Sequence, residues 1–172
     1  MIRIILRQLL QAVILLIIQI FILNNIGLGG YINPYIYVLA ILYLPIQTPR
    51  WLVQILSFVL GFVFDAIVGT PGMHTSACVF VGFIRPYVLK YISPRDGYDT
   101  ESKASIKDMG LSWFLRYVVI LIVAHHTFLF FVESFNAVNF FRTIGRIILS
   151  GLFTITLTIL LQYLRFGKIS KR

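Results

Sequence analysis

Cysteine is nearly absent from this sequence, whose only thiol belongs to Cys78. An intramolecular disulfide and a metal cluster built on several cysteines are therefore both excluded. The sequence also lacks a glycine-rich phosphate loop, a His-Glu-x-x-His pair and a Gly-x-Ser-x-Gly nucleophile turn. Because no familiar catalytic motif is present, the sequence predicts neither an enzyme nor a resident cofactor.

Charged residues are the second scarce group. They make up 12% of the 172 positions, whereas hydrophobic residues make up 59% and the mean hydropathy is +0.90. An ordinary soluble domain is about 25% charged and about 45–50% apolar, so this composition is typical of an integral membrane protein. The length allows about six spans of about 20 residues each. We expect one integral membrane domain over residues 1–172, with no separate soluble domain.

Six apolar segments follow one another along the chain, over residues 4–23, 31–47, 51–68, 73–91, 111–132 and 140–164. Lipid offers no water to unpaired backbone groups, and these segments lack the alternation of barrel strands, so we expect helices. In the second segment Pro34 and Pro45 predict a short, tilted or broken helix. The expected fold class is all-α, a polytopic membrane protein with about six transmembrane helices.

Basic residues outnumber acidic ones, fifteen Lys and Arg against six Asp and Glu, for a formal net charge of +9. The basic residues flank the apolar segments, which is how membrane topology is encoded, so we expect no binding to nucleic acid. Nearly all of them lie on one side if both termini are cytoplasmic. The connections near 24–30, 69–72 and 133–139 are then external, and the loop 92–110, with a short helix predicted over 102–108, is cytoplasmic.

Asp65 lies inside the third apolar segment, just before a turn rich in glycine and proline. A charge in hydrocarbon costs about 2.5–3.5 kcal/mol on insertion scales, so it needs an explanation. Our preferred interpretation is a carboxylate that accepts hydrogen bonds from Thr70, Thr75 or the first backbone amides of the next helix. Two others stay open: Asp65 handles a proton or ligand, or it contacts a partner protein's membrane segment.

Other polar residues of the spans have simpler interpretations. Arg85 is expected to extend its side chain to the cytoplasmic headgroups beside Lys90, so that both anchor the fourth span. His74, His125 and His126 fall near the outer side, but adjacent histidines point about 100° apart on a helix, so a hydrogen-bonding role is preferred over a metal site. Small residues at Ala77 and Gly82, and at Gly145 and Gly151, suggest close helix packing.

The central hairpin resembles the hallmark sequence of the MreD family, the rod shape-determining membrane proteins of bacteria. The residues that carry the resemblance are Gly61, Asp65, Gly69, Pro71, Gly72, His74 and Gly82. The length, the basic N-terminus that leads into the first span and the proline-bearing second segment are similar to those of the family along nearly the whole chain. Only the hairpin is specific, because apolar helices match many families.

The resemblance implies a non-enzymatic scaffold of the cell-elongation machinery in the bacterial cytoplasmic (inner) membrane. The implied partners are a bitopic MreC-like protein, a RodA-type glycosyltransferase and a class B penicillin-binding transpeptidase, with the MreB filament as a further, indirect partner. It also implies a fold similar to the substrate-binding subunit of energy-coupling-factor transporters. No catalytic role and no metal comes with the seven hairpin residues.

Two other function classes are weighed against the scaffold. A substrate-binding subunit of a vitamin-type transporter would need a polar pocket open to the outside, and the short outer connections offer few polar groups for it. A membrane enzyme would need clustered catalytic residues, which the sequence does not show.

Overall fold

The computed structural model describes residues 2–26, 32–99, 102–134 and 140–166, and every regular element in these ranges is helical. The long helices are α1 (Ile2–Phe21), α3 (Arg50–Val68), α4 (Met73–Tyr91), α6 (Leu111–Ser134) and α7 (Phe140–Phe166). Short helices occupy the connections: η1 (Leu23–Asn25), η2 (Ile36–Val38), α2 (Leu39–Leu42) and α5 (Ile106–Met109). The expected all-α class is confirmed.

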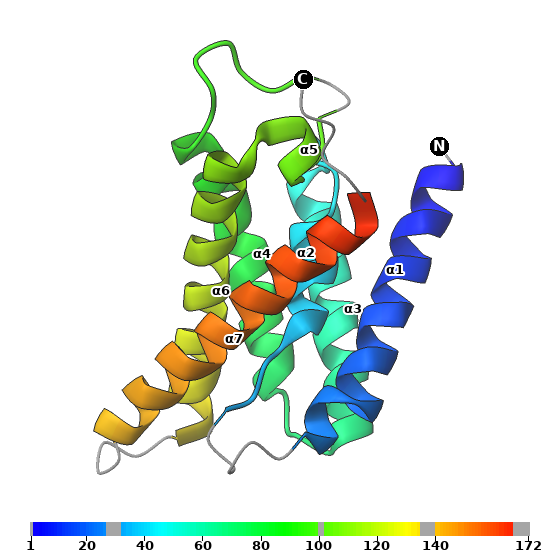
Figure 1. Ribbon diagram of the computed structural model, residues 1–172. Coiled ribbons are helices and arrows are strands. Elements are labelled where there is room, and N and C mark those ends of the chain that lie inside the picture. Colours follow the sequence, from blue (N-terminus) through cyan, green and yellow to red (C-terminus); the bar gives the residue numbers. More distant parts are fainter. Residues whose placement is uncertain (1, 27–31, 100–101, 135–139, 167–172) are drawn as a thin grey trace.

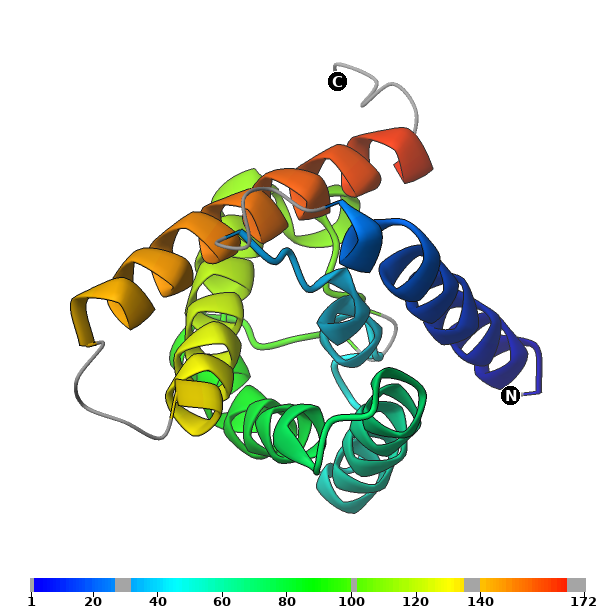
Figure 2. The same ribbon diagram turned by 90° about the horizontal axis from the view of Figure 1, so that it is seen from below.

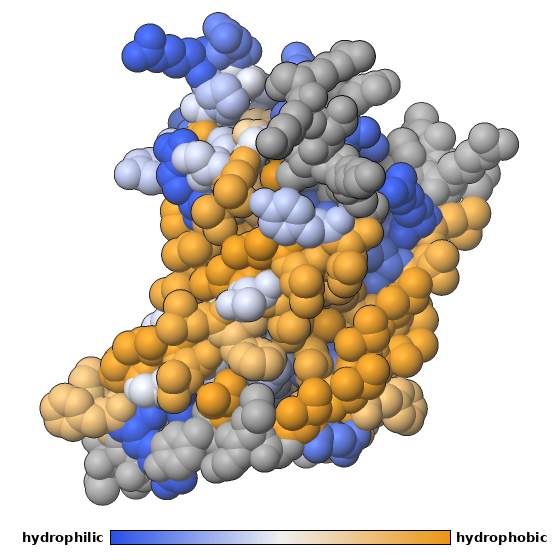
Figure 3. Space-filling view, viewed as in Figure 1, coloured by the Kyte–Doolittle hydropathy of each residue, from blue (hydrophilic) through white to orange (hydrophobic). Residues whose placement is uncertain are grey.

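Four stretches within the described residues are long and apolar enough to cross a membrane: Leu6–Asn25, Arg50–Val68, Leu111–Ser134 and Phe140–Leu164. They correspond to the first, third, fifth and sixth predicted segments. A broad apolar band covers the middle of the molecule, and hydrophilic residues gather toward its two ends (Figure 3). This pattern is that of a protein that spans a lipid bilayer. The helix α4 has the same 19-residue length as α3 but is less apolar, since it contains His74, Thr75 and Ser76 besides two charged residues.

The long helices surround a central segment. α3 packs along α4, α4 along α6, and α6 along α7. Seen end-on, α1, α3, α4, α6 and α7 form an incomplete ring, and the stretch with η2 and α2 lies inside it (Figure 2). α7 crosses the bundle obliquely (Figure 1). The start of α1 and the loop with α5 lie at one end of the bundle, and the α3–α4 turn lies at the other (Figure 1).

The second predicted segment is this central stretch, and it is a broken helix, as the prolines predict. Only residues 36–42 are helical, in η2 and α2, and the chain before and after them is irregular. Its side chains lie in the core, together with those of α3, α4 and α6: the exposed fraction is 0% for Tyr37, Val38, Leu39 and Leu42. Irregular backbone is tolerated at membrane depth only where protein surrounds it, which explains the central position.

Polar side chains of the surrounding helices bond to the irregular backbone of the central segment. Near its start, the Gln19 amide donates to the Pro34 carbonyl at 2.9 Å and accepts from the Ile36 amide at 2.7 Å. Two hydroxyls of α7 also accept from this backbone: that of Ser150 from the Asn33 amide and that of Thr154 from the Tyr35 amide. These bonds replace those that a continuous helix would make within itself, so the buried polar residues are part of the fold.

The loop between α4 and α6 contains a short helix, shorter than the predicted 102–108. Helix α5 covers Ile106–Met109, because the hydroxyl of Ser105 accepts from the Asp108 amide at 3.2 Å and caps the first turn.

Candidate functional site

The α3–α4 hairpin is organised around the carboxylate of Asp65, which is 5% exposed. One carboxylate oxygen, Oδ1, accepts from the Thr70 hydroxyl and from the His74 amide, the latter at 3.1 Å. The other, Oδ2, accepts from the Thr75 amide at 2.8 Å and from the Thr75 hydroxyl at 2.6 Å. All the donors belong to the turn or to the first turn of α4, as the preferred interpretation of Asp65 expects.

Asp65 acts as the N-terminal cap of a helix that has no cap of its own. The residue before α4 is Gly72, which has no side chain to accept from the first amides of the helix. His74 and Thr75 are the second and third residues of α4, so their amides have no partner inside the helix. A carboxylate also interacts favourably with the positive end of the helix dipole. Asp65 therefore joins the end of α3 to the start of α4 by both hydrogen bonding and charge.

Glycine is required in this hairpin for two different reasons. Gly69 ends α3 with φ +79° and Gly72 precedes α4 with φ +81°, a backbone conformation that other residues rarely adopt. At Gly61 the requirement is space, because an added Cβ would lie 2.5 Å from the Thr75 Cα. At Gly82 an added Cβ would meet the Ser57 hydroxyl. With Pro71 exposed in the turn, the structure brings all seven hairpin residues of the resemblance into α3, α4 and their connection.

Behind the hairpin, Tyr37 links two histidines at the centre of the bundle. Its hydroxyl lies 2.9 Å from Nδ1 of His74 and 3.0 Å from Nε2 of His125, and its ring stacks on Phe64 with centroids 4.4 Å apart. The hydroxyl has one proton, so it donates to one imidazole and accepts from the other. Nδ1 of His125 is buried and has no hydrogen-bond partner among the described residues. The central segment is thereby tied to α4 and α6.

The adjacent histidines of α6 point to different partners, as expected. His126 contacts the Ile122 carbonyl through Nδ1 at 2.9 Å and the Thr154 hydroxyl through Nε2 at 3.2 Å. Within the described part of the chain, no group of three or more His, Cys, Asp or Glu side chains is placed to hold a metal ion. The contacts of His74 and His125 with the Tyr37 hydroxyl are hydrogen bonds between elements, as the preferred interpretation expects.

A polar cavity opens beside the hairpin. It has a volume of about 230 Å³ and is lined by Leu23, Asn24, Asn33, Pro34, Tyr35, Phe64, Val68 and His74. The amide and imidazole groups on its wall could bind water or a small polar molecule. Vitamin-sized ligands occupy pockets of about 300–1,000 Å³, so the cavity is smaller than such a ligand needs.

The expectation for Arg85 is wrong. Its side chain is 1% exposed and does not extend to the headgroups. Nε donates to the Tyr117 hydroxyl at 2.8 Å, and one terminal nitrogen donates to the carbonyls of Leu44, at 2.6 Å, and Pro45, at 3.3 Å. The Tyr117 hydroxyl donates in turn to the Leu42 carbonyl at 2.9 Å. Within the described residues, the broken helix leaves the Leu42 and Leu44 carbonyls without a backbone donor, so the guanidinium and the Tyr117 hydroxyl are held inside to supply one. The Pro45 carbonyl also accepts from the Thr48 amide at 3.1 Å and from the Thr48 hydroxyl at 2.7 Å. Lys90 is exposed in the last turn of α4, where anchoring is compatible with its position.

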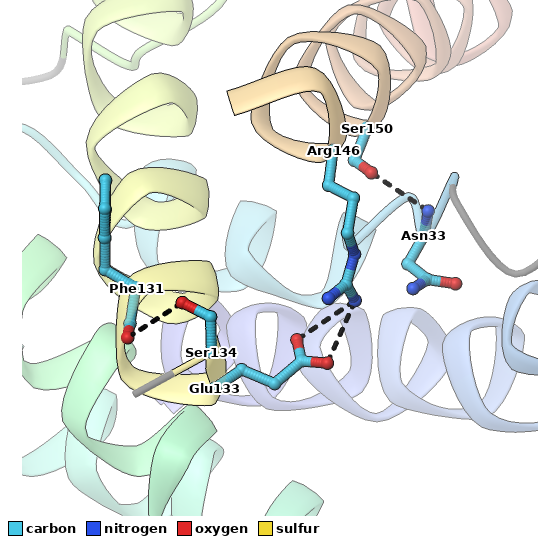
Figure 4. Close-up of polar contacts among 6 residues, drawn as sticks. All are labelled: Asn33, Phe131, Glu133, Ser134, Arg146 and Ser150. Carbon is cyan, nitrogen blue, oxygen red and sulfur yellow. Dashed lines mark hydrogen bonds and ion pairs between the residues drawn. The ribbon is translucent and has the colours of Figure 1, made fainter. Parts of the chain in front are cut away.

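Sequence reasoning missed several polar partners and overestimated one packing motif. Glu133, at the end of α6, forms an ion pair with Arg146 of α7 at 3.0 Å (Figure 4). Nearby, the backbone amide of Asn33 donates to the Ser150 hydroxyl. The buried series Ser150, Thr154 and Thr158, spaced by four residues along α7, was a usable signal for a polar helix face. In contrast, an added Cβ at Gly145 or Gly151 would meet open space, so these glycines do not mark close helix packing.

Comparison with protein-family models, curated proteins and solved structures found no match to this chain.

Removing the carboxylate of Asp65 should weaken the hairpin in proportion to the donors left without an acceptor. Asp65→Asn replaces one carboxylate oxygen by an NH2 group, which then faces one hydroxyl and one backbone amide. The hydroxyl can rotate and accept from the NH2 group, but the backbone amide can only donate and is left without an acceptor. We expect one amide to lose its acceptor in Asp65→Asn and two in Asp65→Leu, at about 1–3 kcal/mol each. Thermal unfolding in detergent should rank wild type above Asn and Asn above Leu. A fully stable Asp65→Leu protein would contradict the capping role.

Proposed function

We propose that this protein is a non-enzymatic membrane scaffold of the MreD type, which supports bacterial cell shape and lateral peptidoglycan synthesis by binding partner proteins. The observation that carries the proposal is that the motif residue Asp65 bonds within the hairpin. Asp65 directs all four of its hydrogen bonds to the turn and to α4. A motif that shapes a helix hairpin is what a scaffold requires, whereas a transported ligand or a reaction requires polar groups free to bind it.

In this proposal the bundle crosses the membrane six times. Besides the four apolar spans, α4 is about 29 Å long at about 1.5 Å per residue, close to the roughly 30 Å of the hydrocarbon core. The central segment with η2 and α2 is the sixth crossing, in keeping with its course through the bundle (Figure 1). An arrangement similar to the substrate-binding subunits of energy-coupling-factor transporters is part of the same proposal.

The proposed orientation places the protein in the cytoplasmic membrane with both termini inside. Lys90, Arg95, Lys103 and Lys107 lie in or near the loop that holds α5. Basic residues favour the cytoplasmic side, so this end is assigned to the cytoplasm and the Asp65 hairpin to the outside.

Lipid-facing side chains of α3 offer a surface for a partner helix. Trp51, Ile55, Phe58 and Phe62 are all more than half exposed, and the rings of Phe58 and Phe62 stack with centroids 5.9 Å apart. Their spacing places the last three along one face of α3. We assign the membrane segment of the MreC-like protein to this face. The RodA-type glycosyltransferase and the class B penicillin-binding transpeptidase join through it, and the MreB filament is reached indirectly.

Affinity purification in mild detergent tests the scaffold. We expect the MreC-like protein to co-purify, and depletion of the scaffold to make rod-shaped cells round. A photo-reactive amino acid at position 58 of α3 should link to that partner. The same group at position 152 is the matched control and should not link to it, because Leu152 is exposed on α7, across the bundle from α3. Normal cell shape on depletion, with no co-purifying partner, would refute the proposal.

The polar groups of the cavity favour a transporter subunit as the second candidate, in which the cavity of about 230 Å³ would widen to admit a vitamin. Asn24, Asn33 and His74 on its wall are groups that bind small polar molecules. Tight, saturable binding of a vitamin by the purified protein, together with unchanged cell shape, would favour this candidate over the scaffold.

A further inference from the structure

A groove separates the first span from the end of the last one. It has a volume of about 290 Å³, and residues of α1 form most of its wall, with Tyr43 from the central segment and Leu161 from α7 completing it. In the space-filling view, hydrophilic residues interrupt the apolar band between α1 and the end of α7 (Figure 3). Apart from Arg7, Gln11 and Tyr43, the residues of the wall are aliphatic. An open groove at this depth in a bilayer fills with something other than water.

The chemical groups of α1 change in a definite order along this groove. Arg7 comes first and is exposed, Gln11 follows one turn later, and the aliphatic residues Ile14, Leu15 and Ile18 continue the wall. Arg7 and Gln11 are four residues apart and share a helix face, about 6 Å from each other along the axis. A cation is thus followed by a hydrogen-bonding amide and then by hydrocarbon.

Gln11 gives a second, independent indication of what occupies the groove. Among the residues that the structure describes, neither its amide nitrogen nor its amide oxygen has a hydrogen-bond partner, although both atoms are buried. Orphaned polar groups are costly in hydrocarbon, so the amide needs a partner that the described protein does not supply. An occupant of the groove with hydrogen-bonding groups one helical turn from the Arg7 guanidinium would supply this partner when the amide turns toward the groove.

We propose that the groove binds one anionic glycerophospholipid. Its phosphate lies at Arg7, its ester groups lie at Gln11 and accept from the amide nitrogen, and one acyl chain lies along Ile14, Leu15 and Ile18. A glycerophospholipid presents charge, hydrogen-bonding esters and hydrocarbon in the same order as the groove does. The backbone of a partner's transmembrane helix offers no such match, since its own bonds are internal; a helix would need both a polar side chain at Gln11 and an anion at Arg7. The site is separate from the α3 face assigned to the proposed partner.

Native mass spectrometry of the protein with phosphatidylglycerol tests the site. We expect one lipid to remain bound at energies that strip the others. The double variant Arg7→Gln and Gln11→Leu should reduce this retention at least tenfold. Arg116→Gln is the matched control, because Arg116 is an exposed arginine of α6 that lies outside the groove and, among the described residues, bonds to Ser112 of its own helix. Circular dichroism verifies that each variant is folded.

Three outcomes would overturn the lipid site. Equal retention in the double variant and in Arg116→Gln would mean that only bulk lipid is bound. Displacement of the bound lipid by soluble glycerol phosphate would assign the site to a free phosphate. Links from a photo-reactive group at position 14 to a protein instead of to phosphatidylglycerol would place a partner helix there. Each result is independent of whether the MreC-like protein co-purifies, so the lipid site and the proposed scaffold can fail separately.

Discussion

Arg85→Met is expected to destabilise this protein severely, although it removes a charge from the interior of a membrane protein. Methionine is of similar length and leaves little empty space, but it donates no hydrogen bond. The Leu44 carbonyl and the Tyr117 hydroxyl oxygen would lose the donor that the structure gives them, whereas the Pro45 carbonyl keeps the Thr48 amide and hydroxyl. Each buried orphan costs about 1–3 kcal/mol, and no water is at hand to replace the guanidinium. We expect this loss to exceed the gain from removing a buried charge.

Two further variants separate the hydrogen-bonding role from that of charge. Arg85→Lys keeps the charge but replaces a planar fork by a single ammonium, so it should be intermediate in stability. Lys90→Met removes an exposed charge five residues later in the same helix and should remain close to wild type. Thermal unfolding in detergent, monitored by circular dichroism, measures all three. If Arg85→Met were as stable as Lys90→Met, the internal bonds of Arg85 would not matter, and headgroup anchoring would again explain this residue.

The contrast between Asp65 and Arg85 shows which hydrogen-bond partners can be predicted from the sequence and which cannot. For Asp65 the partners are within ten residues, in a turn whose glycines and proline are visible in the sequence, so local geometry was sufficient to predict the hydrogen bonds. For Arg85 the partners are 32 to 41 residues away. The position of Arg85 along α4 led to the prediction that its side chain extends to the headgroups. Nothing in the local sequence reveals that the broken central segment lies beside it.

The same limit applies to the rest of the central segment. Pro34 and Pro45 predicted that its helix would be broken, and a broken helix in a membrane needs hydrogen-bond donors and acceptors from elsewhere. Gln19, Ser150 and Thr154 supply them. The polar residues of the other spans could therefore have been assigned to this task as a group, even though their individual partners depend on how the helices pack.

Gly61→Ala, the addition of one methyl group, is expected to disrupt the α3–α4 hairpin. The new Cβ would lie 2.5 Å from the Thr75 Cα and 2.9 Å from the His74 carbonyl oxygen, which are backbone atoms that cannot rotate away. The two helices must separate, at about 1–3 kcal/mol or more for overpacking. Asp65 lies one turn further along the same face of α3, so the separation also pulls its carboxylate away from the Thr75 donors.

Gly145→Ala is the matched control for this variant, since its added Cβ meets nothing within 4 Å in α7. In the middle of a helix, alanine is favoured over glycine by about 0.5–1 kcal/mol, so this variant should be slightly more stable than wild type. The same chemical change therefore has opposite expected signs at the two positions, and thermal unfolding of both proteins in one detergent measures the difference. Equal stability of the two variants would show that α3 and α4 are free to separate at Gly61. Close helix contact would then not be what holds Asp65 against the first turn of α4.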